Sequence, residues 1–171
     1  GRRPGPARCT ARSAASTSAS ARPDRSSASP VIDETGTPDG RGRFNHFQFG
    51  GSIYWTPEIG AHVVYGAIRA KWQSLGWERG ILGYPLSDEV GVTGGRASQF
   101  QDGNVYWSPA TGAHEVHGAI LARYLKLGGT GSRLGLPKSD EYAVGGGRRS
   151  DFTGGSLIWN STTGAVTEVY P

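Results

Sequence analysis

Aromatic rings and acidic pairs recur along this chain in a pattern that suits polysaccharide binding. An aromatic face packs on the C–H groups of a sugar ring, while carboxylates and guanidinium groups bind pairs of hydroxyls through hydrogen bonds. Residues of these types stand at matching positions in successive segments: Tyr54, Trp55, Asp88, Glu89, Arg96, Tyr106, Trp107, Asp140, Glu141 and Arg148, with Trp159 in a third segment. We predict that they form repeated, shallow ligand-binding sites.

The same residues also have a structural interpretation. Alternation along a strand places Tyr54 and Trp55 on opposite faces, and a Trp repeated beside every strand is typical of a core. Tyr54 and Tyr106 are therefore the rings that we expect to face a ligand. The Asp-Glu pairs have an alternative role, in which they cap the segment after a proline and pair with Arg96 or Arg148.

These side chains do not form a catalytic or metal-binding pattern. Paired carboxylates hydrolyse glycosides when one has a raised pKa and the two face each other across a cleft. Here equivalent pairs recur in successive units, whereas catalysis needs one unique, asymmetric site. The repeated His62 and His114 lack a zinc-site spacing, so we expect each to hydrogen-bond a strand to the neighbouring unit. We predict a protein that is not an enzyme and that needs no metal or cofactor.

The positions match because the chain repeats itself with a period of 52 residues. The segment Gly103–Pro109 restates Gly51–Pro57, and Leu134–Pro137 restates Leu82–Pro85. Such self-similarity is typical of an array of small units that share cores with their neighbours. The predicted division is a tail of an earlier unit at residues 31–43, units at 44–96 and 97–148, and a partial unit at 149–171.

Each unit reads as a β-hairpin followed by a short helix. The segment Gly51–Trp55 is rich in aromatic and β-branched residues, and a Pro-Gly turn leads to a second strand at His62–Tyr65. Apolar residues then follow a helical spacing in both copies: Ile68, Trp72 and Leu75, and Ile120, Tyr124 and Leu127. Gly76 and Gly128 end these helices of about ten residues. The predicted fold class is an α+β tandem repeat, with the units packed as a propeller-like or superhelical array.

Two further segments connect the units. Leu82–Pro85 predicts a buried turn in which Gly83 permits close approach or a positive φ. The segment Gly94–Arg96 is predicted to be a loop that returns the chain to the next strand. Phe49 reads as a one-residue insertion ahead of the first hairpin, because it has no counterpart in the second unit.

Residues 1–30 have a different composition from the rest of the chain. They contain six Arg, seven Ser, seven Ala and four Pro, and no Val, Ile, Leu, Phe, Tyr or Trp, which predicts disorder. They also hold the excess positive charge, since residues 31–171 have a net charge of −1. This near-neutral repeat region disfavours nucleic-acid binding. The single Cys9 excludes an intrachain disulfide, and no apolar run is long enough to span a membrane.

A second hypothesis for residues 1–30 is a repeat read in the wrong frame. Allowed codons for these residues, read two nucleotides on, give PATGARPVHGAIRGKYLGVGAAGSKLGLP. Its segments PATGA, VHGAI and GSKLGLP match Pro109–Ala113, Val116–Ile120 and Gly131–Pro137, with the same spacing between the first and last prolines. The coding DNA decides between this hypothesis and a disordered linker or tail.

The motifs Tyr-Trp-x-Pro-x-x-Gly-Ala-His, Gly-Ala-Ile and Leu-Gly-Tyr-Pro-x-Ser-Asp-Glu, recurring in this order, resemble the LGFP repeat family. The name-giving tetrapeptide stands here as Leu82–Pro85 and Leu134–Pro137, with Tyr or Leu in place of Phe. The resemblance covers residues 31–171. It implies a secreted actinobacterial protein associated with the cell wall, in which tandem repeats hold an attached or associated hydrolase or acyltransferase domain on the wall.

The ligand implied by the resemblance is envelope polysaccharide, either arabinogalactan or a peptidoglycan-associated glycan. We therefore expect a non-catalytic wall-anchoring module that gains avidity from repeated weak sites. The alternative is a protein-interaction array that docks a cell-envelope enzyme.

Overall fold

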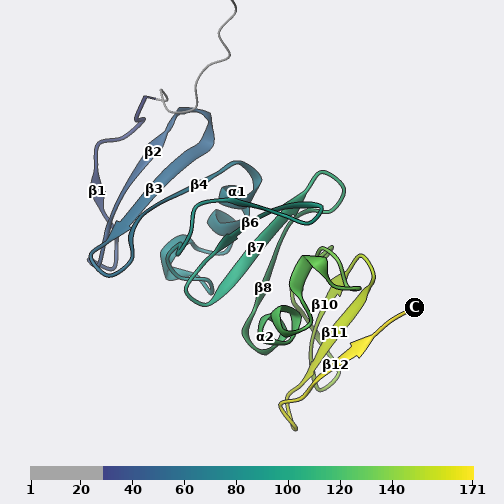
Figure 1. The fold of residues 1–171 in the computed structure, drawn as a ribbon. Helices are drawn as coiled ribbons and strands as arrows, with labels where there is room; N and C mark the ends of the chain where they lie inside the picture. Colours follow the sequence, from purple (N-terminus) through teal and green to yellow (C-terminus); the bar gives the residue numbers. More distant parts are fainter. Residues whose placement is uncertain (1–28) are drawn as a thin grey trace, which may run out of the picture.

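The computed structural model describes residues 29–171. The prediction of disorder or a shifted frame falls almost wholly on residues 1–28, which lie outside the described part. In that part the chain forms three antiparallel four-stranded sheets and two α-helices. Figure 1 shows how these elements follow one another in space. These sheets confirm an α+β repeat, because each repeated segment forms a sheet of its own.

The sheets follow one another along the chain. The first contains β1 (Thr35–Gly36), β2 (Arg43–Phe47), β3 (Gly51–Thr56) and β4 (Gly60–Tyr65). The second contains β5 (Val90–Val92), β6 (Gly95–Gln99), β7 (Gly103–Ser108) and β8 (Gly112–His117). The third contains β9 (Tyr142–Val144), β10 (Gly147–Phe152), β11 (Gly155–Asn160) and β12 (Val166–Val169). Helix α1 (Gly66–Ser74) follows the first sheet and α2 (Gly118–Lys126) follows the second.

The hairpins and helices form where the sequence predicts them. Strands β3 and β4 pair through a tight turn that ends at Gly60, which has a φ of 88°. Both helices end at a glycine with positive φ, Gly76 at 98° and Gly128 at 105°, a conformation that costs glycine little. Ile68 and Trp72 are the buried residues of α1, as their spacing predicts.

The prediction of two strands per unit is wrong, because each sheet has four. The predicted return loop Gly94–Arg96 is instead part of a second hairpin, in which residues 93 and 94 form the turn and Gly95 and Arg96 belong to β6. Strand β6 then pairs with β7 and joins the two hairpins into one sheet. The sequence hid β5 and β6 because they are short and carry many Gly and polar residues, which weakens the strand pattern.

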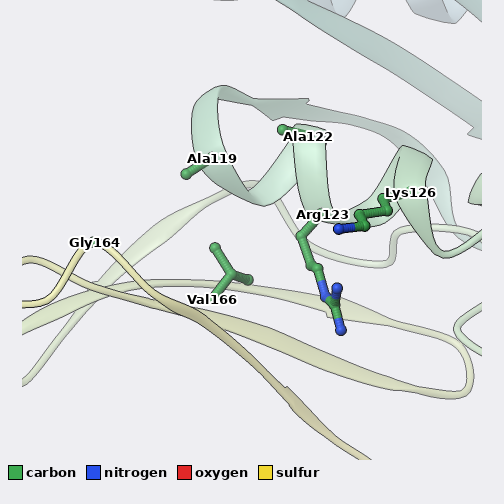
Figure 2. A pocket seen from close by; sticks show the side chains of 6 residues that line it. All are labelled: Ala119, Ala122, Arg123, Lys126, Gly164 and Val166. Atoms are coloured by element: carbon green, nitrogen blue, oxygen red, sulfur yellow. The ribbon is translucent and has the colours of Figure 1, made fainter.

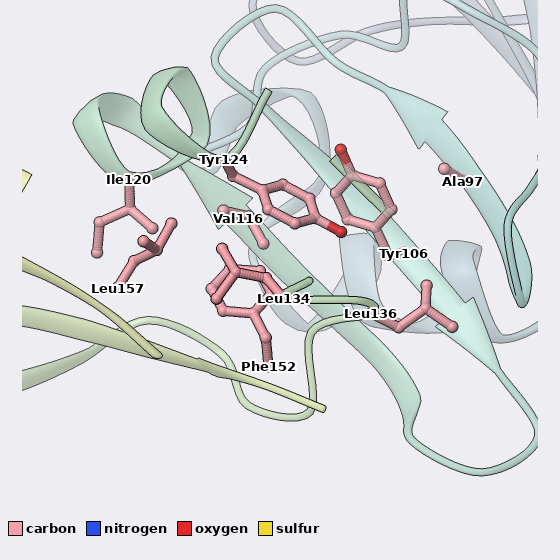
Figure 3. Packing of buried hydrophobic residues seen from close by; sticks show 9 residues of the cluster. All are labelled: Ala97, Tyr106, Val116, Ile120, Tyr124, Leu134, Leu136, Phe152 and Leu157. Atoms are coloured by element: carbon pink, nitrogen blue, oxygen red, sulfur yellow. The ribbon is translucent and has the colours of Figure 1, made fainter. Parts of the chain in front are cut away.

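Each helix lies between two sheets, so successive units share a core. Figure 1 shows α1 between the first and second sheets, and α2 between the second and third. The first shared core joins residues of both neighbouring sheets and of α1: Tyr54, Val64, Ile68, Trp72, Leu82, Tyr84, Phe100 and Val105. The second, drawn in Figure 3, joins Ala97, Tyr106, Val116, Ile120, Tyr124, Leu134, Leu136, Phe152 and Leu157. The predicted sharing of a hydrophobic interior between adjoining copies is confirmed.

The turn after each helix fixes that helix to the following sheet. Leu82 and Leu134 are fully buried, as predicted for this segment. The indole Nε1 of Trp72 donates a hydrogen bond of 3.0 Å to the carbonyl of Gly83, and the hydroxyl of Tyr124 donates one of 2.6 Å to the carbonyl of Gly135. The two units therefore make the equivalent hydrogen bond with different aromatic side chains, Trp72 in the first and Tyr124 in the second.

Every sheet has two faces that differ in their neighbours. We call the face that carries Trp55, Trp107 or Trp159 the upstream face, and the face that carries Tyr54, Tyr106 or Ile158 the downstream face. In the second and third sheets the upstream face packs on the preceding helix, since Trp107 contacts the first core and Trp159 the second. In the first and second sheets the downstream face packs on the sheet's own helix.

Candidate functional site

The same row of three residues crosses the upstream face of every sheet. Strand pairing places an Arg directly opposite the Trp, and the Trp directly opposite a small residue. The rows are Arg43–Trp55–Ala61, Arg96–Trp107–Ala113 and Arg148–Trp159–Val166. Directly opposite residues project from the same face with their Cβ atoms about 5 Å apart. We call each of these rows a rung.

The rung also shows where the repeat period changes. Arg43 and Arg96 are 53 residues apart, whereas Trp55 and Trp107 are 52 apart, so one extra residue lies between Arg43 and Trp55. This residue is accommodated in the short turn at residues 48–50, where Phe49 has a φ of 66° and is 87% exposed. The predicted insertion is confirmed.

A glycine precedes the Arg of every rung, and the strand geometry explains why. A Cβ atom at Gly42, Gly95 or Gly147 would overlap the backbone carbonyl oxygen of the Trp across the ladder. The missing side chain allows the two strands to approach closely next to the ring. This glycine is therefore part of the rung, although it carries no chemistry itself.

The prediction that Tyr faces a ligand while Trp fills the core is wrong. Tyr54 and Tyr106 are 3% and 4% exposed, whereas Trp55 is 42% exposed and Trp107 is half-buried. The Tyr rings lie under their own helices, where the ring of Tyr54 packs edge-on against Trp72 at 4.6 Å. Burial raises the pKa of both Tyr hydroxyls, as expected for core rings. Trp107 and Trp159 pack against the first and second shared cores, and part of each ring stays at the surface.

The Arg of each rung is held in place but keeps access to solvent. The Nε of Arg96 donates to Glu89, and its Nη2 lies 3.2 Å from the hydroxyl oxygen of Tyr65. Arg148 makes the matching contact with Glu141, and the side chains of the two Arg residues are 42% and 43% exposed. A guanidinium has five N–H donors, so each retains donors for a ligand.

The acidic pairs have the structural role that was predicted as the alternative. Glu89 and Glu141 are only 7% and 6% exposed and are occupied by the rung Arg residues, so direct contact of these two carboxylates with a ligand is not supported. Asp88 accepts a hydrogen bond of 2.9 Å from the backbone N–H of Val63, on the outer strand β4. Asp140 does the same for Glu115 on β8, at 3.2 Å.

The hydrogen bonding predicted for the two repeated histidines is present at His114. The Nδ1 of His114 lies 3.2 Å from Asp140, and its Nε2 lies 2.8 Å from the carbonyl of Thr111. His62 lies 3.4 Å from Asp88, the residue equivalent to Asp140. Each histidine thus ties its own strand to the segment that leads into the next sheet.

A charged cluster that sequence reasoning missed lies beside the second and third rungs. His117 contacts Glu115 at 2.6 Å and Glu141 at 3.5 Å, and its hydrogen bond with Glu115 raises the pKa of the imidazole. Lys71 of α1 binds Asp140 at 2.7 Å, which links the first helix to the segment entering the third sheet. Glu115 and His117 were missed because the first unit has Val63 and Tyr65 at these places, so no repeated signal marks them.

A hollow of about 370 Å³ adjoins the third rung, between α2 and the turn before β12 (Figure 2). It is lined by Ala119, Ala122, Arg123, Lys126, Gly164 and Val166. Val166 also belongs to the third rung, so the hollow meets that rung at β12. Arg123 binds Glu168 through Nη2, while its buried Nε has no hydrogen-bond partner in the part of the chain that the structure describes. The hollow thus combines small apolar residues with two cations.

The model of the LGFP repeat family matches the chain three times, at residues 29–80, 82–132 and 134–168. The chain belongs to the LGFP repeat family. Each of the first two matches spans one sheet and the helix that follows it, and the third ends within the third sheet. In these LGFP repeats the rung therefore occurs once per matched segment. A comparison with curated proteins finds no match.

Neither helix of the described residues has the length and hydrophobicity needed to cross a membrane. The candidate site of this LGFP array is therefore the set of three rungs, with the hollow beside the third.

Proposed function

We propose that this chain is a non-catalytic module that anchors its protein to the cell envelope by binding polysaccharide along the three rungs. The observation that carries the proposal is the repetition of the rung. A partly exposed Trp, an Arg with free N–H donors and a small neighbour that leaves the ring accessible recur at the same place in every sheet. An aromatic platform beside a hydroxyl-binding cation is the arrangement that an extended glycan requires.

Repetition gives such a module its affinity. Each rung is open and shallow, so one rung alone supports only weak binding. Three linked rungs on one polymer rebind at high effective concentration, which raises the overall avidity without any new contact. This argument also favours binding over catalysis, since the rung residues are equivalent rather than arranged around one asymmetric centre.

The proposed ligand is arabinogalactan or a peptidoglycan-associated glycan. The proposed location is the cell wall, to which the secreted protein attaches. Both rest on membership in the LGFP family and on the chemistry of the rungs. A propeller-like or superhelical arrangement of further units stays a prediction. Such a curved array would present successive rungs to one polymer chain.

Binding to purified wall polysaccharides tests the proposal directly. Co-sedimentation of the chain with arabinogalactan and, separately, with peptidoglycan identifies the glycan. Loss of one ring through Trp159→Ala should weaken binding by roughly tenfold, because a ring contact contributes about 1 kcal/mol or slightly more. The variant that lacks Trp55, Trp107 and Trp159 together should not bind at all.

Tyr142→Ala provides the matched control, because Tyr142 is an exposed ring of the third sheet that lies outside the rung. This variant should bind like the unmodified chain. Folding of every variant is checked by circular dichroism. A folded triple variant with unchanged binding, or a folded chain that binds neither glycan, would overturn the proposal and favour the protein-docking alternative, which crosslinking to an envelope enzyme would reveal.

A further inference from the structure

The upstream face of the first sheet is an interface without its partner among the described residues. Phe47, Ile53 and Trp55 stand at the places of Phe100, Val105 and Trp107 in the second sheet. Phe100 and Val105 are 3% and 0% exposed because α1 covers them, whereas Phe47 and Ile53 are only partly buried and Trp55 is 42% exposed. The first sheet thus has apolar residues at the positions that the second sheet buries, but leaves them partly exposed.

The equivalent residues are also buried in the third sheet, where α2 packs over them. Phe152 and Leu157 are both fully buried in the second shared core. Figure 3 shows Phe152 in the same cluster as Tyr124 of the helix. The centroids of the two rings are 4.6 Å apart. In both complete interfaces the partner of the upstream face is therefore the helix of the preceding unit.

The opposite end of the array has a different character. On the downstream face of the third sheet, Arg149 binds Asp151 at 2.7 Å and Ser156 at 2.9 Å. Arg149 stands at the place of the buried Ala97 of the second sheet. A polar outer face is typical of a terminal capping unit, whereas an apolar one is typical of an internal unit. The first sheet therefore has an internal type of face.

Residues 29–31 contact the first sheet in the way that residues 84–86 contact the second sheet and residues 136–138 contact the third. The N–H of Gln48 donates to the carbonyl of Ser29 at 3.1 Å, and the N–H of Val31 donates to His46 at 2.7 Å, while Pro30 bridges to Phe47. The segments around the other two prolines make the same three contacts. Before the second sheet, these are Tyr84 with Gln101, Leu86 with Gln99, and Pro85 with Phe100. Before the third sheet, they are Leu136 with Thr153, Lys138 with Asp151, and Pro137 with Phe152. Pro30 therefore stands at the place that Pro85 and Pro137 occupy before the second and third sheets.

We propose that the upstream face of the first sheet binds the helix of a preceding LGFP unit, and that this helix is encoded by the second reading frame of residues 1–30. In both complete units the helix starts 19 residues before the proline, from Gly66 to Pro85 and from Gly118 to Pro137. The second reading places its own Gly-Ala-Ile motif at the same distance before its final proline. Its sequence GAIRGKYLG has Ile and Tyr at the spacing of Ile120 and Tyr124, the two residues that α2 buries.

The test replaces residues 1–30 with the second reading and leaves the rest of the chain unchanged. Backbone amides of β2 and β3 should then exchange at least about tenfold more slowly, because a packed helix suppresses local opening. Acrylamide quenching of Trp55, obtained by difference from Trp55→Phe, should fall toward that of Trp107, which is half-buried in the equivalent complete interface. The matched control is the replaced chain with aspartate in place of the isoleucine of the new Gly-Ala-Ile motif, which should exchange like the original chain.

Three results would overturn the proposal. The first is equal exchange in the original and replaced chains while the other sheets keep their protection. The second is coding DNA incompatible with the second reading. The third is a dimer of the original chain, seen by sedimentation, that Trp55→Asp dissociates, since this would assign the face to a second copy. Each readout is independent of glycan binding, so failure here leaves the proposed function untouched.

Discussion

The substitution Phe152→Ala tests whether neighbouring LGFP units are energetically coupled. Phe152 is fully buried between α2 and the third sheet, with its ring against Tyr124. Burial of roughly 150–200 Å² of ring and backbone-adjacent surface at about 25 cal/mol per Å² corresponds to about 4–5 kcal/mol. Truncation to Ala retains Cβ but leaves a cavity, so the expected loss is about 3–5 kcal/mol. This is a large fraction of the 5–15 kcal/mol, roughly, by which domains of this size are stable.

Urea unfolding measures the total loss, and hydrogen exchange shows where it occurs. Phe152→Ala should accelerate exchange in β10 and β11 far more than in β2 and β3. The repeat offers a reciprocal variant, Phe100→Ala, which removes the equivalent ring next to Trp72 and should loosen the junction of the first and second sheets instead. A loss below about 1 kcal/mol, or equal acceleration of all three sheets by either variant, would refute the shared-core interpretation.

Two further predictions concern the second and third rungs. The pKa of His117 is raised mainly by Glu115, so its stabilising charge is complete below pH 6.5 and is lost as the pH rises through the raised pKa. The midpoint of urea unfolding should therefore fall over that pH range. The variant His117→Tyr, which introduces the residue type of the first unit, should flatten this pH dependence. Gly147→Ala should destabilise by about 2 kcal/mol or more, because its Cβ overlaps a strand carbonyl, while Gly145→Ala, with open space around its Cβ, should change thermal stability little.

Most of the architecture was predictable because the repeat shows each local pattern at least twice. The helix spacing of Ile68 and Trp72, the capping role of Gly76 and the buried Leu82 are each set by short-range sequence patterns. The extra strands β5 and β6 were not predictable, because a three-residue strand such as Val90–Val92 is stabilised by its neighbours in the sheet rather than by its own propensity.

The candidate site was only partly predictable for a related reason. Strand alternation separates Tyr54 from Trp55 but does not say which face the helix covers. Ring size favours Trp as the core residue, yet the helix covers Tyr54, and the first core already contains the larger ring of Trp72. The Arg43–Trp55 pairing depends on β2, whose register includes the extra residue at Phe49 and so departs from the 52-residue period.

The contacts of Asp88 and Asp140 with strand N–H groups limit how the array can grow. Outer strands with free N–H groups recruit foreign strands and start aggregation, and an acceptor that occupies such a group blocks this sideways addition. The addition of further strands to the sheets is thereby restricted at these two edges, so the array extends by stacking whole repeat units. A gene that duplicates or deletes one whole repeat would therefore lengthen or shorten the array without exposing an unprotected strand edge.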